Sequence, residues 1–218
     1  MLIDQRSTMR KILEDILKMP YFKNYAACSG KVHNVAKHED AVEDIFLSHG
    51  LSHLQKGGIK QQQRDAWLKG ADHSDVPNDT FMSQPCGTHN SPDFIVKTNN
   101  KLFFLECKSA SKGTTAPMYN SGIPKEEYIY VFCAEKYNKT TIFMGRDVLP
   151  SKEEQLIQRH IAEARKRDEI LNALLENNHH GISYYTRPMI CHKGGQGKTN
   201  YFTHNKRQPL ERSVLEGV

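Results

Sequence analysis

The sequence predicts an α/β domain in which helices flank a mixed central β-sheet, with a β-hairpin near the C-terminus. Several segments carry apolar residues at the three- and four-residue spacing of an amphipathic helix, and short apolar runs bounded by turn residues are typical of strands. Of the 218 residues, 38% are hydrophobic and 25% are charged, which is ordinary for a globular protein with its own core. We therefore expect a single domain that covers residues 1–218.

Three helical patterns precede the strands. Residues 4–18 place apolar side chains on one face and stop before Pro20, because proline cannot continue a helix. Residues 37–49 show a second such pattern, and residues 61–70 indicate a short third helix. Residues 71–91 are rich in Asp, Ser, Asn, Pro and Gly and predict a long surface loop, of a length that is often functional.

Four apolar runs predict the sheet. Residues 93–97 and 102–107 flank a short polar turn and indicate a β-hairpin. Residues 128–133 and 140–144 indicate two further strands, and the first of these is apolar enough to be a central strand.

The last third of the chain combines a long helix with a second hairpin. A helical pattern runs from Ser151 to about residue 177, and its many charged residues predict a solvated face. Residues 182–191 and 200–204 are then expected to form the arms of the C-terminal hairpin around a glycine-rich turn.

Positive charge is concentrated towards the C-terminus. The formal net charge is +5, and residues 187–212 contain six Lys or Arg against the single acid Glu211. The segment KGGQGKT (193–199) imitates a phosphate-binding P-loop, but the residues after it look like a strand instead of the helix that such a loop needs. We therefore expect no nucleotide cofactor. A basic tip that tracks nucleic-acid phosphates is predicted, with a solvated tail as the alternative, and the contacts would be Lys193, Lys198, Lys206 and Arg207.

Neither membrane insertion nor secretion is expected. No apolar run approaches the roughly 18–20 residues needed to cross a bilayer, and the first residues lack the basic cap and apolar stretch of a signal peptide. The five cysteines are odd in number and scattered, which suits reduced thiols better than a disulfide framework. The sequence therefore predicts a cytoplasmic protein.

Three charged residues stand at the ends of the strands of the first hairpin. Asp93 begins one strand, and Glu106 and Lys108 end the other, where side-chain alternation turns both to one face. Two carboxylates that converge there make a hard oxygen site for Mg²⁺, and the backbone carbonyl of Cys107 can supply a further ligand. Lys108 can then contact an attacking water or a phosphate. A Glu-x-Lys triplet alone is common by chance, so this prediction depends on the whole pattern of loop, hairpin and later strands.

Pro92-Asp93 followed by Glu106-Cys107-Lys108 resembles the motif of the PD-(D/E)XK nuclease superfamily, and the whole chain resembles a small type II restriction endonuclease. The resemblance implies a restriction-endonuclease-like core in which Asp93 and Glu106 bind Mg²⁺ and Lys108 assists the attacking water. The implied reaction is metal-assisted hydrolysis of a phosphodiester bond.

The resemblance also implies a further metal-binding acid from a helix upstream of the motif. Glu39 and Glu43 lie four residues apart on one face of the second predicted helix, and either can serve. Glu39 is preferred because it lies nearer the polar residues that precede the helix, although a solvated helix face explains both acids equally well.

The implied function is Mg²⁺-dependent, sequence-specific cleavage of double-stranded DNA by a homodimer, since a two-fold protein matches two cuts in a pseudo-palindromic site. Two alternatives stay open. The first is a repair or junction-resolving nuclease that reads DNA shape, and the second is a non-catalytic DNA-binding protein whose acids are structural.

The loop at residues 109–122 is small, hydroxyl-rich and glycine-containing, which suits contact with a sugar-phosphate backbone as well as an ordinary surface loop. Lys112 and Asn120 are the expected DNA contacts in it. With these assignments the single nuclease domain divides into an N-terminal helical arm (1–36), a catalytic core (37–178) and a basic C-terminal hairpin or tail (179–218).

Overall fold

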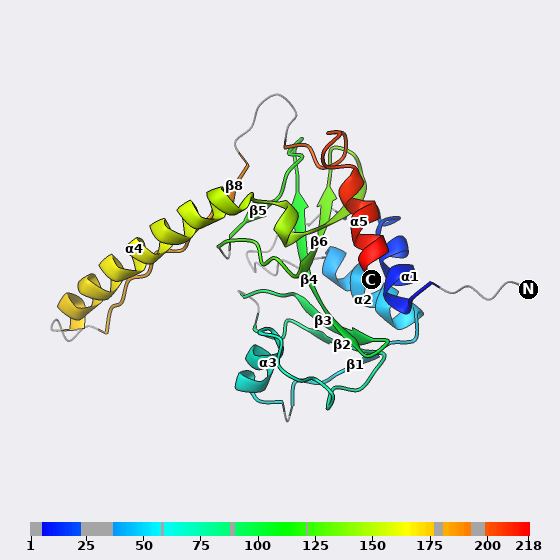
Figure 1. Cartoon of the computed structure of the whole chain (residues 1–218), viewed down its shortest axis with the longest axis horizontal. Helices are drawn as coiled ribbons and strands as arrows, with labels where there is room; N and C mark the ends of the chain where they lie inside the picture. The colour runs from blue at the N-terminus through cyan, green and yellow to red at the C-terminus, as the bar shows by residue number, and fades with distance from the viewer. Residues whose placement is uncertain are drawn as a thin grey trace, which may run out of the picture.

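The computed structural model describes residues 6–22, 37–57, 59–87, 90–120, 122–176, 181–192 and 199–218. Within these residues, six strands form one mixed sheet in the order β1-β2-β3-β4-β6-β7 (Figure 1). The strands are Ser52–His53 (β1), Thr80–Ser83 (β2), Phe94–Thr98 (β3), Lys101–Ala110 (β4), Tyr128–Ala134 (β6) and Lys139–Met144 (β7). Neighbours pair antiparallel, except that β1 runs parallel to β2 and β4 runs parallel to β6. The mixed α/β class predicted from the sequence is confirmed.

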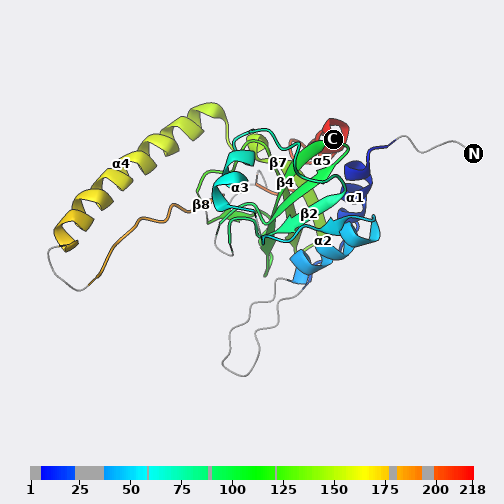
Figure 2. The same cartoon turned by 90° about the horizontal axis from the view of Figure 1, so that it is seen from below.

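Helices lie on both faces of the sheet. The described helices are Thr8–Ile16 (α1), Lys37–Ser48 (α2), Gln61–Trp67 (α3), Ser151–Glu176 (α4) and Pro209–Gly217 (α5), with a short 3-10 helix, Gly145–Asp147 (η1), after β7. Side chains of α1, α2 and α5 share one buried cluster on one face, whereas α3 packs its Trp67 against the other face near β2 and β3 (Figure 2).

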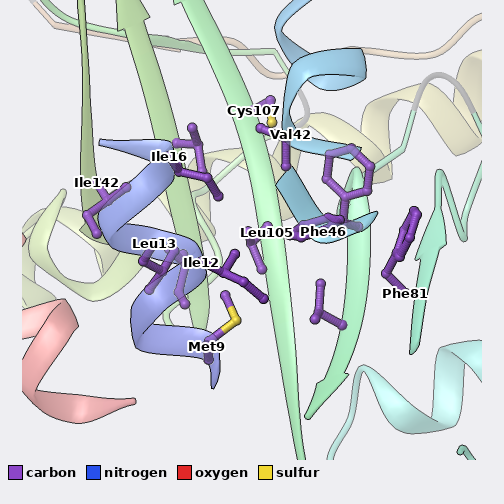
Figure 3. Close-up of a cluster of buried hydrophobic side chains, with 14 of the residues drawn as sticks. Met9, Ile12, Leu13, Ile16, Val42, Phe46, Phe81, Leu105, Cys107 and Ile142 are labelled. Atoms are coloured by element: carbon purple, nitrogen blue, oxygen red, sulfur yellow. The ribbon is translucent and has the colours of Figure 1, made fainter. Parts of the chain in front are cut away.

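Strand β6 separates the two layers of the core. Its side chains alternate, so Ile129 and Val131 join the cluster of α1 and α2, while Tyr130 and Phe132 join an aromatic cluster on the opposite face. Figure 3 shows the first cluster, in which side chains of α1 and α2 gather around Leu105 of β4. All seven residues of β6 are buried, as expected of a central strand.

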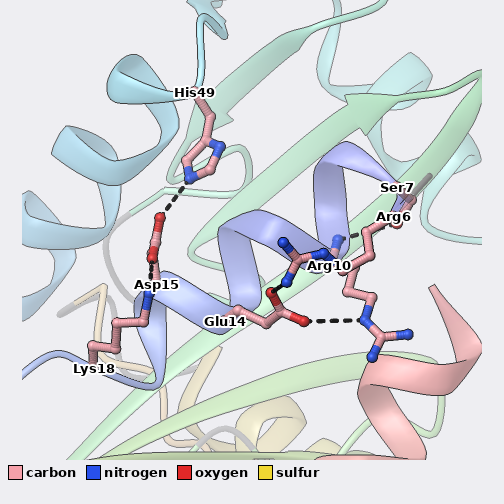
Figure 4. A network of polar contacts seen from close by, with 7 residues as sticks. All are labelled: Arg6, Ser7, Arg10, Glu14, Asp15, Lys18 and His49. Atoms are coloured by element: carbon pink, nitrogen blue, oxygen red, sulfur yellow. Dashed lines mark hydrogen bonds and ion pairs between the residues drawn. The ribbon is translucent and has the colours of Figure 1, made fainter. Parts of the chain in front are cut away.

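Helix α1 is part of this core. Ser7 caps the helix by accepting a hydrogen bond from the backbone N–H of Arg10 at 3.1 Å, and the apolar face of the helix is completely buried. On its polar side the carboxylate of Asp15 meets Nε2 of His49 at 2.8 Å, which links α1 to the end of α2 (Figure 4). The described part of the predicted N-terminal helical arm (residues 1–36) thus contains a helix that packs into the core.

The segment predicted to be one long loop, residues 71–91, contains strand β2. All four residues of β2 pair antiparallel with β3, and Phe81 and Met82 are buried on opposite faces of the sheet. The loop prediction was wrong here because β2 has only four residues, which is too short a run to stand out within a polar segment. The strand forms because it pairs with β3, which buries its side chains on both faces of the sheet.

The C-terminal region differs in detail from the predicted hairpin. Residues 200–204 form turns, and β8 (Ile190–Cys191) pairs antiparallel with β5 (Met118–Tyr119), a strand of the connection between β4 and β6. Helix α5, which was not predicted, packs on β7, and Glu211 accepts a hydrogen bond from the Thr141 hydroxyl at 2.6 Å. The last residues are therefore part of the fold and not a free tail.

Helix α4 projects from the sheet as an arm (Figures 1 and 2). None of its residues is buried, and residues 181–189 run back along it towards β8. The carboxylate of Asp168 and the side-chain amide of Asn172 fix this returning segment through hydrogen bonds of 2.6–2.9 Å to Thr186 and Tyr184. No helix in the described residues has both the length and the apolar character needed to cross a bilayer.

Candidate active site

The candidate site lies where β3 separates from β4. The hairpin pairing ends with Phe94 opposite Leu105, but β4 continues to Ala110 and beyond this point is paired only with β6. From residue 106 onward, one edge of β4 has no neighbouring strand among the described residues, and its backbone groups there need other partners. The predicted residues Asp93, Glu106 and Lys108 all lie at this opening.

Asp93 closes part of the open edge with its side chain. It stands directly before β3, and its Oδ2 accepts a hydrogen bond from the backbone N–H of Cys107 at 2.7 Å. In an extended strand the N–H and C=O of one residue point to the same edge. The Cys107 carbonyl is therefore turned towards the Asp93 side of β4, as the predicted metal ligand must be, while the Cys107 side chain is buried in the core.

Glu106 and Lys108 share the opposite face of β4 from Leu105 and Cys107, as alternation predicted. The ammonium Nζ of Lys108 lies 2.6 Å from Oε1 of Glu106, and the two side chains are only 14% and 6% exposed. The second carboxylate oxygen of Glu106, Oε2, is buried and makes no hydrogen bond of normal geometry among the described residues, although the backbone N–H of Asp93 lies near enough to the carboxylate to lower its pKa. An ionised oxygen left in this state is costly, which indicates a ligand or a proton at this position.

Glu39 reaches the same opening from the first turn of α2. The Gln84 side-chain amide donates a hydrogen bond to Glu39 Oε2 at 3.3 Å, and the Gln84 backbone N–H donates to the carbonyl oxygen of Asp93 at 2.5 Å. Gln84 follows β2 and joins the helix to the start of β3. Sequence reasoning missed Gln84, because a glutamine within a polar segment carries no signal unless the preceding residues are recognised as a strand.

The three carboxyl groups repel one another electrostatically. Burial, followed by repulsion from Asp93 and then from Glu106, raises the pKa of Glu39 from 4.5 to about 7. Burial and the Asp93 charge raise the pKa of Glu106 to about 7 against the opposing effect of Lys108. Burial also raises the pKa of Asp93, although its hydrogen bond from Cys107 and the charge of Lys108 oppose this. These mutual effects place Glu39 with the other two acids; Glu43 is not among the groups that act on them.

These residues fit a hard divalent cation in their chemistry. Carboxylate and carbonyl oxygens are the ligands that Mg²⁺ prefers. A cation would relieve both the weakly satisfied Oε2 of Glu106 and the repulsion of the neighbouring carboxyl groups. In the described residues no three His, Cys, Asp or Glu side chains are yet grouped closely enough to hold a metal ion. Each acid has a partner within the chain, namely Gln84 for Glu39, Cys107 for Asp93 and Lys108 for Glu106.

The residues expected to contact DNA in the 109–122 loop lie at the surface. Lys112 follows β4 with a left-handed φ of 53°, and its backbone N–H donates to the Glu135 carboxylate at 2.8 Å, so its exposed side chain is left to solvent. Asn120 is also exposed, and its carbonyl oxygen accepts a hydrogen bond from Arg187 Nε at 2.7 Å. DNA contact by these two residues stays a prediction.

The expected basic contacts near the C-terminus separate into different environments. Lys206 is exposed, whereas the guanidinium of Arg207 lies over the Tyr201 ring at 4.6 Å and donates to the carbonyl oxygen of Asp147 at 2.8 Å. Arg207 therefore has a packing role between η1 and the C-terminal turns. Lys193 and Lys198 lie outside the described residues, as does most of the KGGQGKT segment.

Comparisons with models of protein families, with curated proteins and with solved structures found no match for this chain.

Proposed function

We propose that this chain is a Mg²⁺-dependent endonuclease that cleaves double-stranded DNA at specific sequences, similar to PD-(D/E)XK nucleases of the type II restriction class. The single observation that carries the proposal is the meeting of Asp93, Glu106 and Lys108 at the open edge of β4, with the carboxyl of Glu39 beside them. A structural role alone does not account for one buried and two half-buried acids around one ammonium, because withdrawing their charges from water costs free energy.

In the proposed site, Asp93, Glu106, the Cys107 carbonyl and Glu39 would hold Mg²⁺. The bound ion would supply charge stabilisation at the scissile phosphate and lower the pKa of the attacking water. Lys108 is held by Glu106 at the same face of β4, where its ammonium can donate hydrogen bonds to the water or to a non-bridging phosphate oxygen. Water attacks the phosphorus, the bond to the leaving oxygen breaks, and that oxygen takes a proton.

A homodimer and a cytoplasmic location belong to the same proposal. The dimer rests on the symmetry of double-strand cleavage. The location rests on the five scattered cysteines of the sequence.

The test is digestion of plasmid DNA of known sequence with purified protein and Mg²⁺, followed by mapping of the new ends. Asp93→Asn and Glu106→Gln keep the size of each side chain but remove its charge, so cleavage should fall by roughly 10²–10³-fold or more while DNA binding persists. Lys108→Met should lose cleavage to a similar extent. Glu43→Gln, one turn along α2 from Glu39, is the matched control and should cleave like the wild type.

The products decide between the remaining possibilities. Discrete, reproducible fragments support sequence-specific cleavage, whereas cutting confined to branched or mismatched DNA supports a repair or junction nuclease. Cleavage at near wild-type rate by Asp93→Asn or Glu106→Gln refutes the site. DNA binding without cleavage under any divalent ion supports a non-catalytic protein.

A further inference from the structure

The projecting helix α4 carries two parallel stripes of side chains. One stripe is half-buried and faces the returning segment; it consists of Ile157, Ile161, Ala164, Asp168 and Leu175. The other stripe lies beside it, recurs at alternating intervals of four and three residues, and is exposed, although its N-terminal members Leu156 and His160 also line the cavity between α4 and residues 186–191. We call this second stripe the α4 seam, and it consists of Leu156, His160, Glu163, Arg167, Ile170 and Leu174.

The seam exposes large apolar side chains at both ends. Leu156 is 58% exposed, Ile170 is 66% exposed and Leu174 is 65% exposed. No residue of α4 is buried, so these three side chains do not contribute to the core. Isolated exposed leucines are common, but Leu156 and Ile170 lie two heptads apart and Leu174 lies one turn beyond Ile170. Exposed apolar side chains at this spacing on a projecting helix are typical of a surface that pairs with another helix. From Leu156 to Leu174 the seam spans about 27 Å, since an α-helix rises about 1.5 Å per residue.

Four of the six side chains along the seam are self-complementary in position, whereas His160 and Ile170, which are also equally distant from residue 165, form a mixed pair. Leu156 and Leu174 are equally distant from residue 165, and so are Glu163 and Arg167. If a second α4 lies antiparallel across the seam with the two-fold axis level with residue 165, Leu156 faces the partner's Leu174. In the same arrangement Glu163 faces the partner's Arg167, and this opposite-charge contact occurs twice.

We propose that α4 is a dimerisation arm that pairs in antiparallel orientation with α4 of a second copy of this chain. Parallel pairing fits less well, because it sets Glu163 against the partner's Glu163 and Arg167 against the partner's Arg167. DNA fits the seam poorly as well, because a phosphate backbone requires an excess of cations, whereas the seam balances Glu163 against Arg167 and is apolar at its ends.

This inference gives a surface to the homodimer of the proposed function, but it does not depend on catalysis. The experiment therefore measures oligomeric state alone, by sedimentation equilibrium of the full chain from about 1 to 100 μM without DNA or divalent metal. A single helix pair buries little area for an interface, so a dissociation constant in the micromolar range is expected for the wild type.

Charge exchange at the centre of the seam separates the proposed pairing from other modes. In Glu163→Arg, both contacts between residues 163 and 167 of the two chains become arginine against arginine. In Arg167→Glu, both become glutamate against glutamate. Each single variant should therefore weaken the dimer by roughly tenfold or more. The double variant Glu163→Arg/Arg167→Glu restores both opposite-charge contacts and should return the dissociation constant to within about threefold of the wild type. Glu169→Arg makes the same charge change on the far side of α4 and should leave it unchanged.

Helix content by circular dichroism serves as the second measurement, because Glu163 and Arg167 also lie 3.9 Å apart within one helix. An exposed pair of this kind stabilises a helix only slightly, so helix content should change little in any variant. A wild-type chain that stays monomeric at about 100 μM overturns the proposal, as does a dimer that both single variants leave intact. A double variant as weak as the single ones overturns the antiparallel register. None of these outcomes bears on whether the chain cleaves DNA.

Discussion

At the scale of single residues, the candidate site sets three carboxyl groups against one ammonium. Glu106 is paired with Lys108, but Glu39 and Asp93 have only neutral hydrogen-bond donors as partners. Burial and repulsion therefore hold protons on this cluster up to a pH at which ordinary carboxyl groups are ionised. Protons and a divalent cation compete for the same oxygens, so ion binding should strengthen as the pH rises through about 7.

The raised pKa values of Glu39 and Glu106 also predict how the stability of the metal-free protein depends on pH. The raised pKa values mean that, from about pH 4.5 to 7, the folded chain binds more protons at Glu39 and Glu106 than the unfolded chain does. The contribution of these groups to the free energy of unfolding therefore falls as the pH rises through that window. Glu106→Gln removes one such group and should be more stable than the wild type by roughly 1–3 kcal/mol at pH 8, with little difference at pH 4.5. Chemical denaturation of the metal-free protein at both pH values measures this.

Comparison with Glu43→Gln isolates the effect, because Glu43 lies on the same helix outside the cluster. Mg²⁺ should stabilise the wild type more at pH 8 than at pH 5, and should stabilise Glu106→Gln less than the wild type at pH 8. Equal stability of Glu106→Gln and the wild type at pH 8 would contradict the assignment of a costly buried charge to Glu106.

At the scale of secondary-structure elements, the site exists because β3 is shorter than β4. The sequence contained enough information for the two strands, the turn between them and the facing of Glu106 and Lys108, because all of these follow from local alternation within a few residues. The preference for Glu39 over Glu43 came only from proximity to a polar segment, and a role for Glu39 stays a prediction, although Glu39 lies near Asp93 and Glu106. Gln84 was out of reach, since its contacts with α2 and β3 join residues that are 45 and nine positions apart.

The short strands that the sequence did not place correctly share one physical cause. Strand β2 has four residues and β5 and β8 have two each, and such short segments become strands only through their partners. The half-buried environment of Arg207 likewise follows from Tyr201 and Asp147, which come together only in the fold. Local pattern therefore determined the long elements, while tertiary pairing determined the short ones.

Gly145 tests the packing between the end of β7 and the segment that leads into β6. A Cβ placed on Gly145 would lie 1.9 Å from the carbonyl oxygen of Lys125 and 3.0 Å from a ring carbon of Tyr130. The Lys125 backbone N–H in turn donates to the Tyr130 hydroxyl at 3.0 Å, so the segment cannot move without breaking that contact. Gly145→Ala should lower the free energy of unfolding by about 1–3 kcal/mol, as measured by denaturant titration.

Gly57→Ala is the matched control, because nothing lies within 4 Å of a Cβ there. It should change the free energy of unfolding by less than about 0.5 kcal/mol. Equal losses of stability in the two variants would show that the short distance between position 145 and the Lys125 carbonyl oxygen does not make alanine unfavourable at Gly145.

At the scale of the whole molecule, the chain combines a buried sheet with an arm that has no core of its own. Every residue of β6 is buried, whereas α4 has 26 residues and none of them is buried. Helices draw most of their stability from tertiary packing, so α4 depends on the returning segment 181–189 and on whatever else covers its seam. The sheet and the arm should therefore open with different free energies, and only the arm should respond to protein concentration.

Amide hydrogen exchange measured by mass spectrometry checks this division. Amides of β6 should exchange only through global unfolding and be the slowest in the described chain, while amides of α4 should exchange through local opening well below that free energy. Raising the protein concentration from about 1 to 100 μM should slow exchange in α4 and leave β6 unchanged, because pairing of two seams stabilises only the arm. In Glu163→Arg the concentration effect should disappear. Exchange in α4 as slow as in β6 at the lowest concentration would mean that the arm is held by the core, and that the seam needs no partner to be stable.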